Sequence, residues 1–129
     1  MRTFIKLKVV RNEANQIEEK TYAFALQMVE TYKFLSDIQK EFILSKQLLR
    51  SGTSIGAMVC EAKFAQSRAD FINKLSIALK EANESKYWIR LLHDTHYIDD
   101  SIYLKLHNEI KEIIAMLVSI VRSSKNKLE

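Results

Sequence analysis

The sequence predicts an all-α protein folded as an antiparallel four-helix bundle with an up-down-up-down order of helices. Three observations favour this fold class. The 129 residues include no proline and only two glycines, which are the residues that sheet-containing domains use in their turns. Four stretches carry apolar residues at helical spacing. The breaks between them are short, and short connections make consecutive helices run antiparallel.

The first helical stretch begins near Asn15, because Asn15 and Glu18 have the spacing of an N-cap residue and its partner. Ser36 and Asp37 interrupt the apolar pattern and mark the end of this helix. The residues predicted to face the core are Ile17, Thr21, Phe24, Met28 and Leu35.

Residues 1–14 show a different pattern. Between Ile5 and Val9, apolar residues alternate with lysines, which is the period of a β-strand. A single strand is not stable alone, so it would have to pack on something or remain disordered. We therefore expect an extended or disordered N-terminal arm over residues 1–14, the bundle over residues 15–123 and a basic tail over residues 124–129.

Three further helices follow. The second runs from about Glu41 to Gln66, and Ser67 with Asp70 three residues later predicts the start of the third. Residues 93–100 break the pattern again before the fourth helix. The predicted core lines are Leu44 or Ser45, Leu48, Gly52, Ile55, Val59 and Ala62 in the second helix, then Phe71, Leu75, Ala78, Ala82, Ser85, Trp88 or Ile89, and Leu92, and finally Tyr103, Leu106, Ile110, Ile113, Leu117 and Ile120.

Cysteine content and hydropathy indicate the cellular compartment. Cys60 is the only cysteine, which excludes an internal disulfide and is typical of the reducing cytoplasm. The uncharged run from Ser51 to Cys60 is far shorter than the roughly 20 residues that span a bilayer. We expect a soluble, cytoplasmic protein with no membrane partner.

Basic residues are concentrated at the two ends of the chain. The net charge is +4, yet the residues between the two ends carry more acidic than basic side chains. In an antiparallel bundle, both chain ends and the connection between the second and third helices lie at one end, which we call the basic pole. Four aspartates lie at the opposite end. The residues of the basic pole are Arg2, Lys6, Lys8, Arg11, Lys63, Arg68, Arg122, Lys125 and Lys127.

The stretch from Ser45 to Ala62 carries the most distinctive motif. It resembles the second helix of the four-helix-bundle proteins encoded in intervening sequences of bacterial 23S ribosomal RNA genes. That helix has the pattern Q-x-x-R-S-x-x-S-I-x-x-N-x-x-E, and Met58 stands here in place of the asparagine. The resemblance covers roughly residues 15–122. The matching positions are Gln47, Arg50, Ser51, Ser54, Ile55 and Glu61.

The resemblance implies an assembly and a class of partner. It implies a homo-oligomer, a pentameric ring in particular. The chain is also similar to the accessory proteins of diversity-generating retroelements, which are basic pentamers that bind nucleic acid. RNA or another nucleic acid is therefore the partner that the resemblance implies. It supplies no established activity.

The motif residues have two interpretations. Gly52 and Gly56 would suit a phosphate-binding loop, but the Gly-Lys-Ser/Thr of that loop is absent, so close approach of another helix is preferred. Arg50 and Glu61 suggest an ion pair between helices or subunits rather than an acid/base pair. Helix packing or an oligomer interface is thus the predicted role of Gln47, Arg50, Ser51, Gly52, Ser54, Ile55, Gly56 and Glu61.

Other reactive side chains do not form a predicted site. His93 and His96 provide two metal ligands where a zinc site normally takes four. Cys60 has no neighbouring pattern that would activate a thiolate and is expected to be a buried small residue. Tyr87 and Trp88 could stack on bases, but packing is the preferred interpretation. We predict no catalytic residue, metal, cofactor or small-molecule substrate.

These observations predict a non-enzymatic, homo-oligomeric bundle that binds RNA or another nucleic acid through its basic pole, or acts as an adaptor there. The alternative is a structural scaffold that presents surfaces to another protein and has no nucleic-acid role. The basic ends would then serve only solubility.

Overall fold

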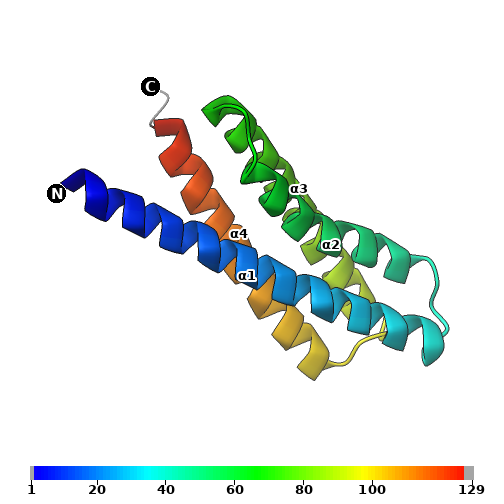
Figure 1. Ribbon diagram of the computed structural model, residues 1–129. Helices are drawn as coiled ribbons and strands as arrows, with labels where there is room; N and C mark the ends of the chain where they lie inside the picture. Colours follow the sequence, from blue (N-terminus) through cyan, green and yellow to red (C-terminus); the bar gives the residue numbers. More distant parts are fainter. Residues whose placement is uncertain (1, 127–129) are drawn as a thin grey trace.

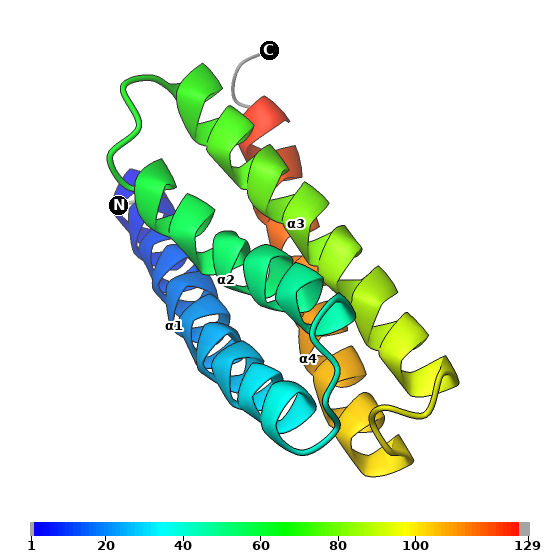
Figure 2. The same ribbon diagram turned by 90° about the vertical axis from the view of Figure 1, so that its right-hand side faces the viewer.

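The computed structural model describes residues 2–126, and the side chains from residue 15 to residue 126. This part of the chain contains no strand. Figure 1 shows helices joined by short connections, and Figure 2 shows that consecutive helices run antiparallel, as predicted. The helices are α1 (Arg2–Asp37), α2 (Leu44–Ala62), α3 (Arg68–Asp94) and α4 (Asp100–Asn126).

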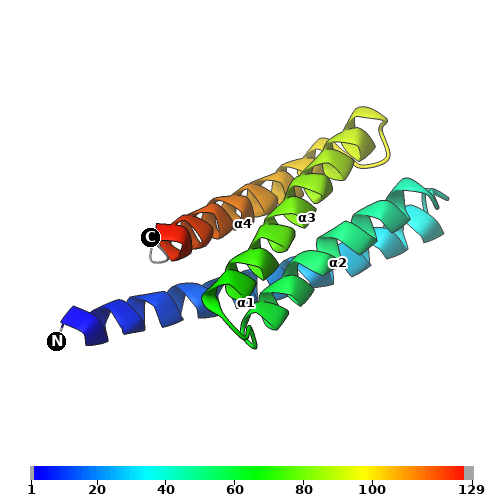
Figure 3. The ribbon, with the colours of Figure 1, turned by 90° about the horizontal axis from the view of Figure 1, so that it is seen from above.

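The helices pack in the order of the chain. Helix α1 packs on α2, α2 on α3, and α3 on α4, and a smaller contact between α4 and α1 closes the bundle. The diagonal pairs, α1 with α3 and α2 with α4, make no comparable contact in the described part of the chain. This is the arrangement expected of an up-down-up-down bundle, and Figure 3 shows it from a third direction.

The N-terminal segment differs from the prediction. Residues 2–14 form the first turns of α1 in place of an extended or disordered arm, so Asn15 lies inside the helix and does not cap it. Alternation over a few residues does not decide between strand and helix, because lysine, leucine and arginine are all good helix formers. Adding turns to an existing helix costs far less than starting one. At 36 residues, α1 is much longer than α2 with 19.

Apolar residues fill the core along the predicted lines. Phe24 and Met28 of α1 are buried, and so are Ile55 of α2 and Ile110 of α4. Where the sequence left two choices, Ser45 and Ile89 are the buried residues. The helical periods therefore predicted most of the core correctly.

Three core predictions were wrong by one position or in degree. Ile72 is buried where Phe71 was expected, and Val121 is buried where Ile120 was expected. Phe71, Ile120 and Tyr103 are only partly buried, packed at the edge of the core. A straight helix has 3.6 residues per turn, so a line drawn in steps of seven drifts off the core over several turns.

The two glycines of α2 allow α1 to approach closely. A Cβ atom at Gly52 would lie 2.5 Å from Sδ of Met28, and one at Gly56 would lie 3.3 Å from the carbonyl oxygen of Thr21. Both neighbours belong to α1 of the same chain. The small residues thus serve a helix contact inside the bundle, which offsets the roughly 1 kcal/mol of helix propensity that each glycine loses relative to alanine.

A buried carboxylate caps α2. The side chain of Glu41 accepts hydrogen bonds from the backbone N–H groups of Ile43 at 3.0 Å, Leu44 at 2.8 Å and Ser45 at 2.6 Å. Burial by itself raises the pKa of Glu41, but these hydrogen bonds outweigh it and hold the pKa below its usual value. Glu41 therefore satisfies backbone donors that the first turn of a helix leaves without partners.

The topology separates two ends of the molecule. Both ends of the described chain lie at the same end as the α2–α3 connection, and the other two connections lie at the opposite end (Figure 2). Four exposed aspartates surround those two connections, so we call that end the acidic pole. They are Asp37, Asp94, Asp99 and Asp100.

Candidate nucleic-acid interface

Four of the predicted basic-pole residues have described side chains, and all four are exposed. They come from the α2–α3 connection, the first turn of α3 and the last turns of α4. Four others belong to the first turns of α1, and their side chains lie outside those that the structure describes. Lys127 lies outside the described residues altogether. The described residues are Lys63, Arg68, Arg122 and Lys125, and the four in α1 are Arg2, Lys6, Lys8 and Arg11.

The described cations differ in how they are neutralised. Lys63 forms an ion pair with Glu18 of α1, with 2.6 Å between Nζ and Oε1. Arg68, Arg122 and Lys125 form no ion pair with any side chain that the structure describes. Among the described side chains of the basic pole, these three cations can consequently bind an anion without breaking an internal ion pair.

The start of α3 fixes the position of Arg68. The hydroxyl of Ser67 accepts a hydrogen bond from the backbone N–H of Asp70 at 3.0 Å, which is the predicted N-cap. The carboxylate of Asp70 in turn accepts from the backbone N–H of Gln66 at 3.2 Å. The connection between α2 and α3 is therefore held by side-chain caps, and Arg68 projects from a defined helix start.

Arg50 of the α2 motif bridges two glutamates of α3. Its guanidinium nitrogens lie 3.4 Å from Oε2 of Glu81 and 2.5 Å from Oε1 of Glu84. Burial raises the pKa of Glu81, and Arg50 opposes that rise. The hydrogen bond from Arg50 lowers the pKa of Glu84. These contacts are ion pairs between two helices of one chain, which is one of the two arrangements that the sequence left open.

Most other motif residues also contact a neighbouring helix. The hydroxyl of Ser85 in α3 donates to the hydroxyl of Ser51 at 2.9 Å, and both residues are fully buried. Glu61 pairs with Lys74 of α3, with 3.3 Å between the charged atoms. Ile55 is buried in the core. The motif thus holds α2 against both of its neighbours.

Two motif residues face away from that packing. The hydroxyl of Ser54 donates to the carbonyl oxygen of Arg50 at 2.6 Å, within its own helix. Gln47 is exposed. Neither makes a contact that would define a binding site inside one chain.

Comparisons with known proteins show which family this bundle belongs to. Residues 13–119 match the family model described as 23S rRNA-intervening sequence protein. The chain belongs to this family. A solved structure from Bacteroides thetaiotaomicron VPI-5482, described as a protein with unknown function from the S23 ribosomal protein family, is 55% identical with a TM-score of 0.84. The match covers 85% of this chain and 98% of that chain. No curated protein matches.

The family description agrees with the resemblance seen in the second helix. Neither the family description nor that of the solved structure names an enzymatic activity. None of the helices in the described part of this family member is long and apolar enough to cross a membrane. The site must therefore be judged on its own chemistry.

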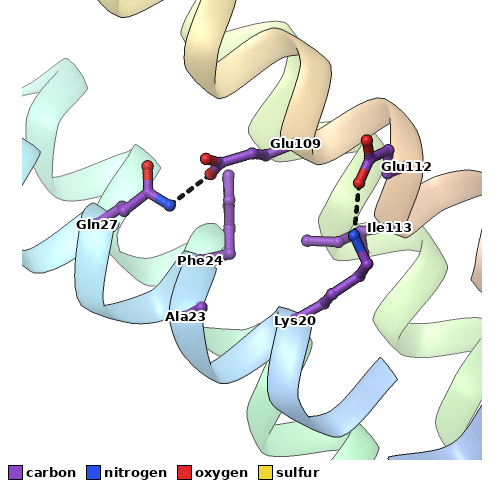
Figure 4. Close-up of a pocket in the computed structure, with 7 residues that line it drawn as sticks. All are labelled: Lys20, Ala23, Phe24, Gln27, Glu109, Glu112 and Ile113. Carbon is purple, nitrogen blue, oxygen red and sulfur yellow. Dashed lines mark hydrogen bonds and ion pairs between the residues drawn. The ribbon is translucent and has the colours of Figure 1, made fainter. Parts of the chain in front are cut away.

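A hollow between α1 and α4 is an alternative place for a ligand (Figure 4). Its volume is about 180 Å³, and Phe24 is among the residues that line it. At its rim, Lys20 pairs with Glu112 and Gln27 donates to Glu109, each at 2.5 Å. The polar groups that face one another across the hollow are thus already partnered, which leaves no convergent group for a ligand.

His93 and His96 lie at the acidic pole. Nε2 of His93 is 2.7 Å from Oδ1 of Asp100, and this contact raises the pKa of His93. The ring of Tyr103 stacks on the same imidazole, with 4.1 Å between the ring centres. His96 is exposed in the connection to α4. Among the described residues, no three histidine, cysteine or acidic side chains are placed to hold a metal ion.

Cys60 corrects one expectation of the sequence analysis. The residue is exposed and not buried, because Val59 occupies the core position of that turn of α2. Tyr87 and Trp88 behave differently from each other. Trp88 packs at the edge of the core, whereas Tyr87 is 59% exposed on α3.

One further residue of the basic pole was not predicted from the sequence. Phe64 follows Lys63 in the α2–α3 connection and is 83% exposed. The sequence does indicate that Phe64 is exposed, because the predicted core line of α2 ends at Ala62 and the Ser67 cap follows three residues after Phe64. An aromatic residue in that gap has no core position to occupy.

Proposed function

We propose that this family member is a non-enzymatic, cytoplasmic homo-oligomer that binds RNA, or another nucleic acid, through its basic pole. One observation carries the proposal. Arg68, Arg122 and Lys125 are exposed at the same end of the bundle and have no ion-pair partner among the described side chains. Such a surface favours a polyanion, because cations that neutralise phosphates release the counterions condensed on the nucleic acid.

An exposed apolar stripe on α1 supports the homo-oligomeric part of the proposal. Tyr22, Leu26 and Val29 of α1 are 66%, 51% and 40% exposed and lie three or four residues apart, so they form one apolar stripe. A stripe of this kind is typical of a surface that packs on another subunit. The form that we propose is a homopentameric ring. In such a ring, the basic poles of all subunits would line one face. Each added pole raises the effective affinity for one strand.

Removing the three free cations tests the binding surface. We expect the triple variant Arg68→Ala, Arg122→Ala and Lys125→Ala to bind single-stranded RNA roughly tenfold or more weakly at about 50 mM salt. The matched control removes three exposed lysines nearer the acidic pole, and its affinity should stay within about twofold. Equal losses in both variants, or no binding by the wild type, would reject the proposal. The control residues are Lys33, Lys46 and Lys105.

The scaffold alternative rests on the apolar stripe alone. In that case Tyr22, Leu26 and Val29 would bind another protein, and the basic pole would bind nothing. Light scattering of the purified protein before and after nuclease treatment distinguishes the two functions. An oligomer that loses mass and ultraviolet absorbance at 260 nm after nuclease supports nucleic-acid binding. An oligomer with no nucleic acid and no affinity for added RNA supports the scaffold.

A further inference from the structure

Phe64 is an exposed aromatic residue at the basic pole. At 83%, its exposed fraction is the largest of any large apolar side chain that the structure describes. It lies in the α2–α3 connection, directly after Lys63 and four residues before Arg68. The α2–α3 connection is at the basic pole, at the same end as the last turns of α4 (Figure 2).

The backbone around Phe64 is fixed. Its N–H donates to the carbonyl oxygen of Glu61 at 3.0 Å, and the N–H of Ala65 donates to that of Ala62 at 3.2 Å. Ala62, buried at 4% exposure, already fills the last core position of α2. The ring of Phe64 is therefore directed away from the core, and it contributes little to the stability of the single chain because it stays in water.

The charges around Phe64 favour one class of ligand. Arg68, Arg122 and Lys125 lie at the same pole and pair with no side chain between residues 15 and 126, while Lys63 is paired with Glu18. A flat apolar ring with free cations at the same end matches a strand that offers both phosphates and exposed base faces. A duplex offers the phosphates but hides its base faces, because its bases are stacked on one another.

We propose that Phe64 is a stacking platform for an unpaired base, and that the basic pole consequently prefers single-stranded nucleic acid to duplex. The proposal rests on the nucleic-acid function proposed above and adds the class of nucleic acid. Arg68, Arg122 and Lys125 bind the phosphates of the strand, and the ring of Phe64 contacts the face of one base. RNA and DNA single strands share this chemistry.

The test compares two substitutions of Phe64 on three probes. The probes are a 12-nucleotide oligoadenylate, the matching oligodeoxyadenylate and a 12-base-pair RNA duplex, with affinity measured by fluorescence anisotropy. Stacking on one aromatic ring corresponds to a roughly 5- to 100-fold change in affinity. We expect Phe64→Ala to weaken binding of both single strands by this factor and to change duplex binding by less than about twofold. Phe64→Trp should retain single-strand binding.

Two controls separate stacking from other roles. Phe64→Leu keeps an apolar side chain without a ring, so it should lose single-strand affinity as Phe64→Ala does. Tyr87→Ala removes an exposed aromatic residue outside the basic pole and should leave the affinity for all three probes unchanged. Retained affinity in Phe64→Leu would overturn the inference, and so would a change in oligomeric mass in Phe64→Ala, which would place the ring in a subunit contact.

The outcome for the wild type separates this inference from the proposed function. If the wild type binds neither single strand nor duplex, the proposed function itself fails. If it binds both equally and Phe64→Ala weakens neither, or weakens both by the same factor, the nucleic-acid function stands and the stacking role of Phe64 is rejected.

Discussion

At the scale of single residues, Gly52 is the position where the packing of α2 on α1 leaves least space. A Cβ atom there would lie 2.5 Å from Sδ of Met28, whose side chain is fully buried and has little freedom to move. The gain in helix propensity from alanine is about 1 kcal/mol. Overpacking a core typically costs about 1–3 kcal/mol, so steric strain should outweigh that gain.

We therefore expect Gly52→Ala to lower the free energy of unfolding by up to about 2 kcal/mol, the overpacking cost less the gain in helix propensity. Met28→Ala should also destabilise the protein, because it leaves a cavity. The double variant should be more stable than the sum of the two single effects predicts, since the new methyl group occupies space that Met28 has vacated. Urea unfolding of the four proteins measures this coupling, and strict additivity would contradict the described contact.

The sequence predicted the burial of a residue correctly where the residue was apolar and also lay on the core line of its helix. Val59 and Ile55 are apolar and fall on the core line, and both are buried. Cys60 is an apolar type one position off that line, so its exposure was missed. Phe64 lies beyond the end of the line, where no helical period gives a direction. Its exposure depends on the geometry of the connection, which residue type alone does not specify.

At the scale of elements, α2 depends on a cap that comes from outside the helix. Glu41 accepts three backbone hydrogen bonds at the start of α2, and its pKa lies below the usual value despite burial. A carboxyl group whose pKa is lowered by folding adds stability above its unfolded pKa, and that stability is lost as pH falls through its folded pKa. The contribution of Glu41 is therefore present at neutral pH and disappears in acid.

We expect Glu41→Gln to lower the free energy of unfolding by about 1–2 kcal/mol at pH 7, because glutamine offers one acceptor and turns an N–H₂ group toward backbone N–H donors. The difference from wild type should shrink as the pH falls below the ordinary pKa of a glutamate, about 4.3, because the stability that comes with the lowered pKa of Glu41 is lost in that range. Glu30→Gln, at an exposed position of α1, is the matched control and should change stability little. A Glu41→Gln effect that is constant from pH 7 to pH 3 would refute the capping role.

The sequence predicted the boundaries of helices well where a side chain marks the end. Ser67 and Asp70 marked the start of α3, and the structure shows the hydrogen bond between them. The start of α1 was predicted at Asn15 and lies at Arg2. Asn15 has the right residue type for a cap, but capping is optional when good helix formers precede it. Residue type alone therefore did not reveal that the helix had already begun.

At the scale of the whole molecule, topology produces the separation of charge. Four helices with short connections place both ends of the described chain at one end and the exposed aspartates at the other (Figure 2). This polarity followed from the sequence, because it needs only the helix count and the brevity of the breaks. The identity of the partner does not follow in the same way, since cations attract phosphates of any sequence.

The position of bound nucleic acid tests the central claim most directly. Photo-crosslinking of a single-stranded RNA oligonucleotide carrying a photoreactive base, followed by mass spectrometry of the peptides, maps where the strand lies. We predict crosslinks in residues 62–74 and 118–126, at the basic pole. Crosslinks centred on residues 94–105, at the acidic pole, or spread evenly over the bundle would contradict the account.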